Sequence, residues 1–233
     1  MSSFHFRDFS VRQSNSGLKV GTDAMVFGAV INSDGKSKGL DIGTGTGVLS
    51  LMVAQKNSKI QIQAIDVQKG AIQDAAFNFQ NCSYSNRLKE IHEDFLAFDP
   101  NQKFDLIFTN PPFYADAKLG ASDQLNQAKH ILEMTPKALF QKVKSALEET
   151  GSFWIIWPFQ ASSEIITVAS KYGLYPQVCM VINGKPAIPT RIILEFGFQR
   201  EEIIEREITI RTHSGDYSDE YKNLTKDFHN KTL

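Results

Sequence analysis

Asp41-Ile42-Gly43-Thr44-Gly45-Thr46-Gly47 is a glycine-rich segment between two apolar runs. A short run leads into it and a longer one, residues 48–54, follows it, which predicts a strand, a tight turn and a helix. Glycines in such a turn let the backbone approach a ligand, because no Cβ is in the way, and the helix N-terminus then faces that ligand. A dinucleotide-binding turn has a glycine three residues after its second glycine, where this chain has Val48. The segment therefore favours a nucleotide-like ligand but argues against NAD.

The rest of the chain alternates between strand patterns and helix patterns. The expected strands cover residues 38–42, 59–66, 88–92, 104–109, 152–157, 174–182, 191–199 and 207–211. The expected helices cover residues 18–31 (with Thr22 or Asp23 as the cap), 47–56, 68–80, 136–149, 161–172 and 218–227. Alternation predicts a parallel sheet with helices on both faces, and the helix-free loop at 183–190 predicts a closing hairpin. We therefore expect an α/β, doubly wound (Rossmann-like) sheet, mostly parallel with an antiparallel last strand.

The length and pattern favour a single domain, residues 1–233. Within it we expect an N-terminal extension at 1–37, irregular at 1–17, a catalytic core at 38–199, and a C-terminal strand and helix at 200–233.

The composition is that of an ordinary globular protein. Of its 233 residues, 42% are hydrophobic and 22% are charged, and the net charge is −1. This balance gives no global basic field for a nucleic acid, so RNA binding would need a local patch. The two cysteines and five histidines have no metal-ligand spacing, so no metal is expected. The chain shows no membrane-spanning run and no signal-peptide pattern, so we expect a cytoplasmic protein with no membrane partner, favoured as a monomer.

Asp66 ends the second expected strand, about 20 residues after the glycine turn. Ligands of doubly wound sheets bind at the carboxyl ends of the strands, and a carboxylate there can accept hydrogen bonds from both ribose hydroxyls of a nucleoside. The alternative is a helix N-cap for the segment that begins at Gln68. Given the glycine turn, we favour the ligand role.

Asn110-Pro111-Pro112-Phe113 follows the fourth expected strand and is the most specific motif in the chain. An exocyclic aromatic amine is a poor nucleophile because its lone pair is delocalised into the ring. Two acceptors at its N–H bonds, the Asn110 side-chain oxygen and the Pro111 carbonyl, would free that lone pair. The prolines make the loop rigid, and Phe113 offers a ring face on which a base can stack. The motif therefore predicts methylation of a planar nitrogen, with these four residues as the catalytic group.

The glycine turn resembles motif I of the class I S-adenosylmethionine-dependent methyltransferases, whose sheet also closes with an antiparallel strand. The resemblance implies S-adenosyl-L-methionine as cofactor and S-adenosyl-L-homocysteine as product. It also implies that a carboxylate after the third strand, Asp94, meets the adenine amino group and that Phe95 packs on the ring. With these, the expected cofactor-binding residues of the core are Asp41, Gly43, Thr44, Gly45, Gly47, Asp66, Val67, Asp94, Phe95 and Asn110.

Four motifs together resemble the bacterial tRNA1(Val) (adenosine-37) N6-methyltransferase family. They are Gly-Leu-Lys-Val-Gly-Thr-Asp at 17–23, the glycine turn at 41–47, Asn-Pro-Pro-Phe at 110–113 and Glu-Tyr-Lys-Asn-Leu-Thr-Lys-Asp-Phe at 220–228. The resemblance implies a tRNA partner, N6-methylation of the adenosine beside the anticodon, and positions near the cofactor for Lys19 and Thr22. The chain departs from the family in one segment. We expect the family to have an arginine-rich segment after the Asn-Pro-Pro-Phe motif, whereas this chain has Asp-Gln-Leu-Asn-Gln-Ala-Lys-His at 123–130.

The substrate-binding residues that we expect are Phe113, Tyr114, Lys222 and Lys226. The two lysines belong to a basic and aromatic C-terminal tail, for which a solvated terminal helix is the simpler interpretation.

Other functions remain open at this point. Enzymes that methylate ribosomal-RNA guanine N2 or protein glutamine share the Asn-Pro-Pro-Phe motif, but they carry an additional domain for which residues 1–37 are too short. DNA adenine methyltransferases need a target-recognition domain, so no DNA partner is expected. A non-catalytic protein that binds S-adenosylmethionine or RNA is a further alternative, against which the intact Asn110 motif argues.

Overall fold

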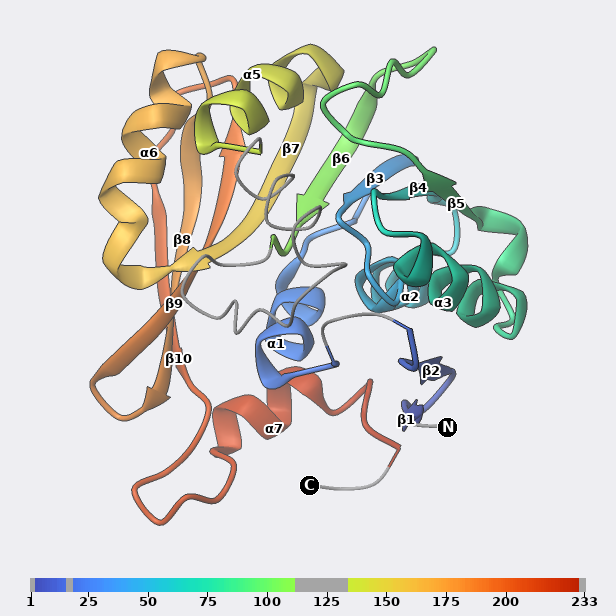
Figure 1. The fold of residues 1–233 in the computed structure, drawn as a ribbon. Helices are drawn as coiled ribbons and strands as arrows, with labels where there is room; N and C mark the ends of the chain where they lie inside the picture. Colours follow the sequence, from blue (N-terminus) through green and yellow to red (C-terminus); the bar gives the residue numbers. More distant parts are fainter. Residues whose placement is uncertain (1–2, 16–18, 112–133, 231–233) are drawn as a thin grey trace, which may run out of the picture.

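The computed structural model describes residues 3–15, 19–111 and 134–230 of the chain. Among these residues, eight strands form one sheet: β3 (Lys38–Ile42), β4 (Gln61–Asp66), β5 (Leu88–His92), β6 (Phe104–Thr109), β7 (Leu147–Pro158), β8 (Tyr175–Lys185), β9 (Ile188–Gly197) and β10 (Ile204–Thr209). Their order across the sheet is β10-β8-β9-β7-β6-β3-β4-β5 (Figure 1). Two short strands, β1 (Ser3–His5) and β2 (Ser10–Arg12), pair with each other outside it.

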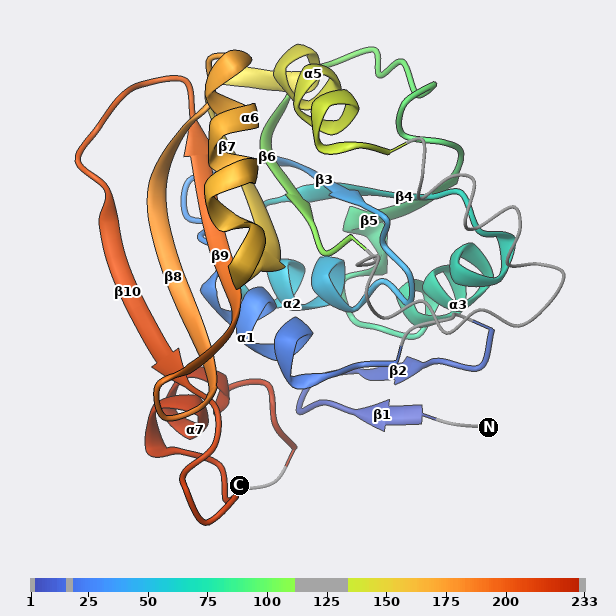
Figure 2. The ribbon, with the colours of Figure 1, turned by 60° about the vertical axis from the view of Figure 1, so that its left-hand side comes forward.

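The described helices lie on both faces of the sheet: α1 (Thr22–Val30), α2 (Val48–Lys56), α3 (Lys69–Gln80), α5 (Pro136–Ala146), α6 (Ser162–Lys171) and α7 (Asp219–Thr225). One apolar cluster joins the sheet to α1, α2, α3 and α7. A second cluster joins the opposite face to α5 and α6. Figure 2 shows these two helices from a second direction. The predicted doubly wound arrangement is therefore confirmed.

The antiparallel strand is β9, which pairs antiparallel with both β7 and β8 and corresponds to the strand expected at 191–199. It is not the last strand in the chain, because β10 follows it and pairs parallel with β8 at the edge of the sheet.

Three local expectations were wrong. The extension at 1–37 contains the β1–β2 pair, in which Phe4 lies opposite Val11, so this part of the chain is not irregular. The helix expected at 136–149 ends at Ala146, because the buried Leu147 pairs with Phe104 and extends β7 backwards. Neither Thr22 nor Asp23 caps α1: its N-cap is Gly21, which has no side chain to bond the helix.

The C-terminal tail is part of the core and not a solvated helix. Tyr221 of α7 is 1% exposed, and Phe228 is buried in the same cluster as Phe6. The Arg7 N–H donates to the Phe228 carbonyl at 2.9 Å, so the two ends of the described chain are joined by backbone as well as by packing.

The turn after β3 depends on three glycines in the left-handed region and on Asp41. Gly43, Gly45 and Gly47 have φ of 68°, 56° and 80°. The fully buried Asp41 carboxylate accepts hydrogen bonds from the Thr44 and Ser50 hydroxyls, each at 2.7 Å, and so ties β3 to the start of α2. Burial raises the pKa of Asp41 from 3.8 to about 6, and the two hydroxyl bonds partly oppose this shift.

Gly47→Ala should destabilise the fold more than Gly45→Ala, as measured by urea unfolding without cofactor. Both residues have positive φ, so alanine costs about 1–2 kcal/mol at either position. A Cβ on Gly47 would also lie 2.5 Å from the ring of the buried Phe79, whereas a Cβ on Gly45 would meet nothing within 4 Å. The overpacking adds about 1–3 kcal/mol at position 47. Equal losses for the two variants would show that Phe79 moves aside freely.

Replacing Asp41 with asparagine should change how stability depends on pH. The folded state holds the proton of Asp41 up to pH 6, whereas the unfolded chain releases it near 3.8. The wild type therefore gains free energy of unfolding relative to Asp41→Asn as the pH falls from 6 to 4, by up to about 1.4 kcal/mol per pH unit. Denaturant unfolding at several pH values measures the difference, and parallel pH profiles for the two proteins would contradict it.

Candidate cofactor and methyl-transfer site

The carboxyl ends of three neighbouring strands lie at one level of the sheet. Ile42, the last residue of β3, pairs with Ile65 of β4 on one side and with Thr109 of β6 on the other. The residues that follow these pairs are Gly43, Asp66 and Asn110, on strands spaced about 4.8 Å apart. The chain passes from β3 to β4 and β5 on one side and then crosses to β6 on the other side of β3, so this is the switch point at which open α/β sheets bind ligands.

The glycine turn provides open space rather than hydrogen-bond donors. A Cβ built on Gly43 or Gly45 would meet nothing within 4 Å. The N–H groups of Gly43 and Thr44 donate to the Ile65 carbonyl, and that of Gly45 donates to the Asp66 carboxylate. Because these donors are used inside the protein, the turn suits an uncharged part of a nucleoside better than a pyrophosphate, which agrees with the argument against NAD.

Asp66 lies beside this turn and is 8% exposed. One of its oxygens accepts the Gly45 N–H at 2.9 Å, and the other accepts the Gln68 N–H at 2.8 Å. The N-cap of α3 is Gln68, so Asp66 is not itself the cap that the alternative interpretation required. Each carboxylate oxygen keeps a second lone pair that can accept a ribose hydroxyl. Burial raises the pKa of Asp66, and the backbone hydrogen bonds oppose that shift.

The residues after β4 and β5 complete this side of the site. Val67 is half-buried, and its carbonyl lies 3.0 Å from Nε2 of His92, at the end of β5. Asp94 accepts the Leu96 N–H at 2.9 Å with its side chain, which shapes the turn that follows. Phe95 is 2% exposed and packs in the second apolar cluster with Ile65. Its ring is therefore a core group in this structure, and the adenine contacts of Asp94 and Phe95 stay predictions.

Asn110 and Pro111 follow β6 directly and are half-buried. The hydroxyl of the preceding Thr109 donates to the Ile42 carbonyl at 2.8 Å, immediately before the glycine turn. This bond joins the end of β6 to the end of β3, and so it fixes the position of the backbone from which Asn110 continues. The remaining motif residues, Pro112 and Phe113, and the expected substrate contact Tyr114 lie outside the described residues.

Two groups of expected residues lie in elements other than these strand ends. Lys19 is exposed, and Thr22 begins α1, a helix that packs on α2. Lys222 and the exposed Lys226 belong to the end of the chain around α7, which follows β10. Since α7 packs on α1 as well as on β10, its position is not that of the sheet edge, and a substrate contact of these lysines stays a prediction.

The sequence interpretation missed two buried polar residues of α3, Asp74 and Asn78, of which Asn78 contacts the glycine turn. Both are buried, and the Asn78 amide donates to the Thr46 carbonyl in the glycine turn at 2.8 Å. Their signal was present in the sequence: they lie four residues apart among the apolar positions 71, 75 and 79, so two polar side chains share the buried face of a helix.

Within residues 3–15, 19–111 and 134–230, no group of three or more metal-ligating side chains could hold an ion. Over the same residues, no helix is long and apolar enough to cross a membrane.

Several solved structures share the fold. A predicted O-methyltransferase from Agrobacterium tumefaciens matches with a TM-score of 0.70 and 14% identity, covering 88% of this chain and 96% of its own. The N-methyltransferase NodS from Bradyrhizobium japonicum, in complex with S-adenosyl-L-homocysteine, matches with a TM-score of 0.55 and 18% identity, over 75% and 84% of the two chains. At these identities the likeness concerns the fold alone, which is that of the class I methyltransferases.

The sequence comparisons are more specific. The family model for the methyltransferase small domain matches residues 13–179. The tRNA1(Val) (adenine(37)-N6)-methyltransferase of Flavobacterium psychrophilum is 35% identical, with 98% of this chain and 99% of the relative covered. The enzymes of that name from Bacteroides thetaiotaomicron and Vibrio campbellii are 32% and 33% identical, again with at least 95% of each chain covered. With nearly full coverage at this identity, the chain belongs to the tRNA1(Val) (adenine(37)-N6)-methyltransferase family.

Proposed function

We propose that this protein transfers a methyl group from S-adenosyl-L-methionine to N6 of an adenosine in tRNA, at position 37 of a valine tRNA. The observation that carries the proposal is that Asn110, the glycine turn and Asp66 follow paired residues at the ends of β6, β3 and β4. Asn110 is therefore one strand from the glycine turn and two strands from Asp66. Family membership supports the same reaction and the same substrate.

The residues present fit the cofactor. A Cβ on Gly43 or Gly45 would meet nothing within 4 Å, which leaves space beside the turn for a nucleoside, and Asp66 offers a carboxylate for its ribose. S-adenosyl-L-methionine, when bound, supplies an electrophilic methyl group, so no strong base is needed. What the chain itself must do is hold the target amine and draw its N–H bonds out of the ring plane, which the Asn110 oxygen and the Pro111 carbonyl can do.

The reaction can be tested directly on defined RNA. The purified protein should methylate a valine tRNA transcript with adenosine at position 37, and mass spectrometry of its nucleosides should show N6-methyladenosine. The matched control is the same transcript with guanosine at position 37. Methylation of that control at the same rate would place the target elsewhere, and labelling of protein instead of RNA would favour a glutamine methyltransferase.

Asp66→Ala should weaken binding of S-adenosyl-L-homocysteine in calorimetry by about 1.5–3 kcal/mol, through loss of charge-assisted hydrogen bonds to the ribose. Asp105→Ala is the matched control, because Asp105 also bonds backbone N–H groups, those of Ser37 and Lys38, but at the amino end of β3. The control should lose stability and keep its affinity. Equal losses of affinity in the two variants would mean that Asp66 acts only by supporting the fold.

Asn110→Ala should separate chemistry from cofactor binding. Loss of one aligned hydrogen bond in the transition state lowers the methyl-transfer rate by about 10²–10³-fold, equal to about 2.7–4 kcal/mol. The affinity for S-adenosyl-L-homocysteine should change little, because Asn110 acts on the target amine. Single-turnover kinetics on tRNA and calorimetry measure the two quantities. A wild-type rate for this variant would show that the loop is only a turn.

A further inference from the structure

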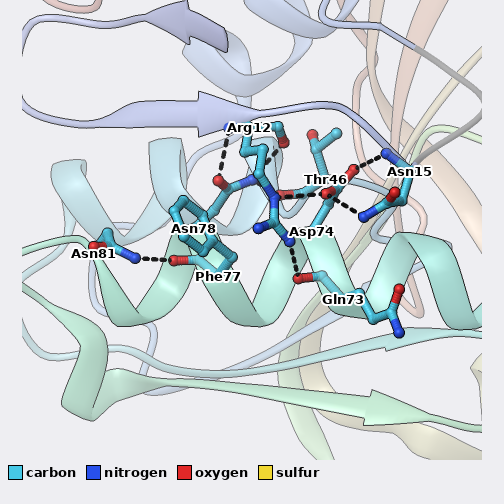
Figure 3. A network of polar contacts seen from close by, with 8 residues as sticks. All are labelled: Arg12, Asn15, Thr46, Gln73, Asp74, Phe77, Asn78 and Asn81. Carbon is cyan, nitrogen blue, oxygen red and sulfur yellow. Dashed lines mark hydrogen bonds and ion pairs between the residues drawn. The ribbon is translucent and has the colours of Figure 1, made fainter. Parts of the chain in front are cut away.

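A buried polar network joins α3 to the chain that follows β2, as Figure 3 shows. The Asp74 carboxylate is fully buried and accepts hydrogen bonds from Nε of Arg12 at 2.9 Å and from the Asn15 N–H at 2.7 Å. The Arg12 guanidinium also donates to the Gln73 carbonyl at 2.9 Å and lies 4.0 Å from the centre of the Phe77 ring. The network therefore holds residues 12–15 against the helix.

Asn78 extends this network to the glycine turn. Its side-chain oxygen accepts the Arg12 N–H at 2.7 Å, and its amide nitrogen donates to the Arg12 carbonyl at 2.9 Å. The same nitrogen donates to the Thr46 carbonyl at 2.8 Å, so both amide hydrogens are used. One buried side chain therefore sets the distance between β2 and the turn that faces the proposed cofactor.

Gly70 brings the same segment close to Asp66. The first turn of α3 begins three residues after Asp66, and a Cβ on Gly70 would lie 2.6 Å from the Asn15 carbonyl oxygen. The backbone at Asn15 therefore rests directly on the start of α3. The Val20 N–H donates to the Gln13 side chain at 2.9 Å. This bond connects residues 12–15 to the chain beside Lys19, just before α1.

Attachment of the N-terminal strands does not require this network. Phe6, Phe9 and Val11 are already buried in the first apolar cluster, which holds β1 and β2 in place. Buried polar networks with every member hydrogen-bonded chiefly select one geometry over others. Here that geometry relates three parts of the site: the glycine turn, the start of α3 after Asp66, and residues 12–15.

We infer that Asp74 and Asn78 are positioning residues of the cofactor site, which hold the segment 12–15 and the glycine turn at the spacing that S-adenosyl-L-methionine requires. This inference rests on the proposed function, and it assigns to the N-terminal segment a role in cofactor affinity rather than in catalysis.

Gly70→Ala is the sharpest test, because it removes no hydrogen-bonding group and alanine is the better helix former. The added Cβ must displace the Asn15 backbone from α3. The dissociation constant of S-adenosyl-L-homocysteine, measured by calorimetry, should rise by about tenfold or more, equal to about 1.4 kcal/mol. The KM for the cofactor should rise likewise, while kcat at saturating cofactor stays within about twofold of wild type.

Asn78→Asp provides a second test at almost unchanged volume. The variant keeps the acceptor for the Arg12 N–H but places an oxygen against the Arg12 and Thr46 carbonyls, so affinity should fall at least as far as in Gly70→Ala. Asn81→Ala is the matched control: Asn81 is the exposed C-cap residue of the same helix, and its side chain bonds only the Phe77 carbonyl among the described contacts, so affinity and KM should stay at wild-type values.

The outcomes are distinct. If Gly70→Ala folds and binds S-adenosyl-L-homocysteine as tightly as wild type, the inference is overturned, whether or not Asn78→Asp folds. If wild type itself fails to bind S-adenosyl-L-homocysteine, the proposed function is overturned first. A lowered unfolding midpoint with unchanged affinity and KM would assign the network to stability alone.

Discussion

The site depends on the register that places the ends of β3, β4 and β6 at one level. Ile42 pairs with a residue of each neighbour, and the Thr109 hydroxyl adds a hydrogen bond to the Ile42 carbonyl where the turn begins. A slip of one residue in any of these strands would turn its side chains to the opposite face of the sheet. The buried apolar side chains on both faces therefore hold the strands in this register, although they take no part in the reaction.

Two buried carboxylates lie at this edge, and they are held in different ways. Asp41 bonds side-chain hydroxyls within its own strand-turn-helix unit, whereas Asp66 bonds backbone N–H groups on both sides of itself. Burial raises the pKa of each, and the charge of Asp66 adds to the rise at Asp41. The free-energy cost of burying both acids is offset in part by these hydrogen bonds. Asp41 thus shapes the turn, and Asp66 is the acid that borders the open space.

The parts of the chain outside the core motifs are packed onto the same side of the sheet. The β1–β2 pair, α1 and α7 share one apolar cluster with α2 and α3 (Figures 1 and 2). Tyr221 and Phe228 are core residues of that cluster, so the basic and aromatic C-terminal tail is packed on the domain rather than free in solvent. The net charge of −1 means that any RNA contact has to come from a local cluster of basic residues rather than from the charge of the whole chain.

The sequence by itself determined the order of strands and helices, the position of the glycine turn, and the presence of Asp66 and Asn110 after strands. These are local properties, because periodicity, glycines and prolines act within a few residues of the chain. Only the tertiary structure decided that Leu147 extends β7, that residues 3–12 form a strand pair, and that Asn78 reaches the glycine turn. Each of these depends on a partner 32 or more residues away or on burial against another element, as with the bond from Asn78 to Thr46. A polar side chain on a helix carries no local sign of the carbonyl that it will meet, and for that reason its role appears only when the chain is folded.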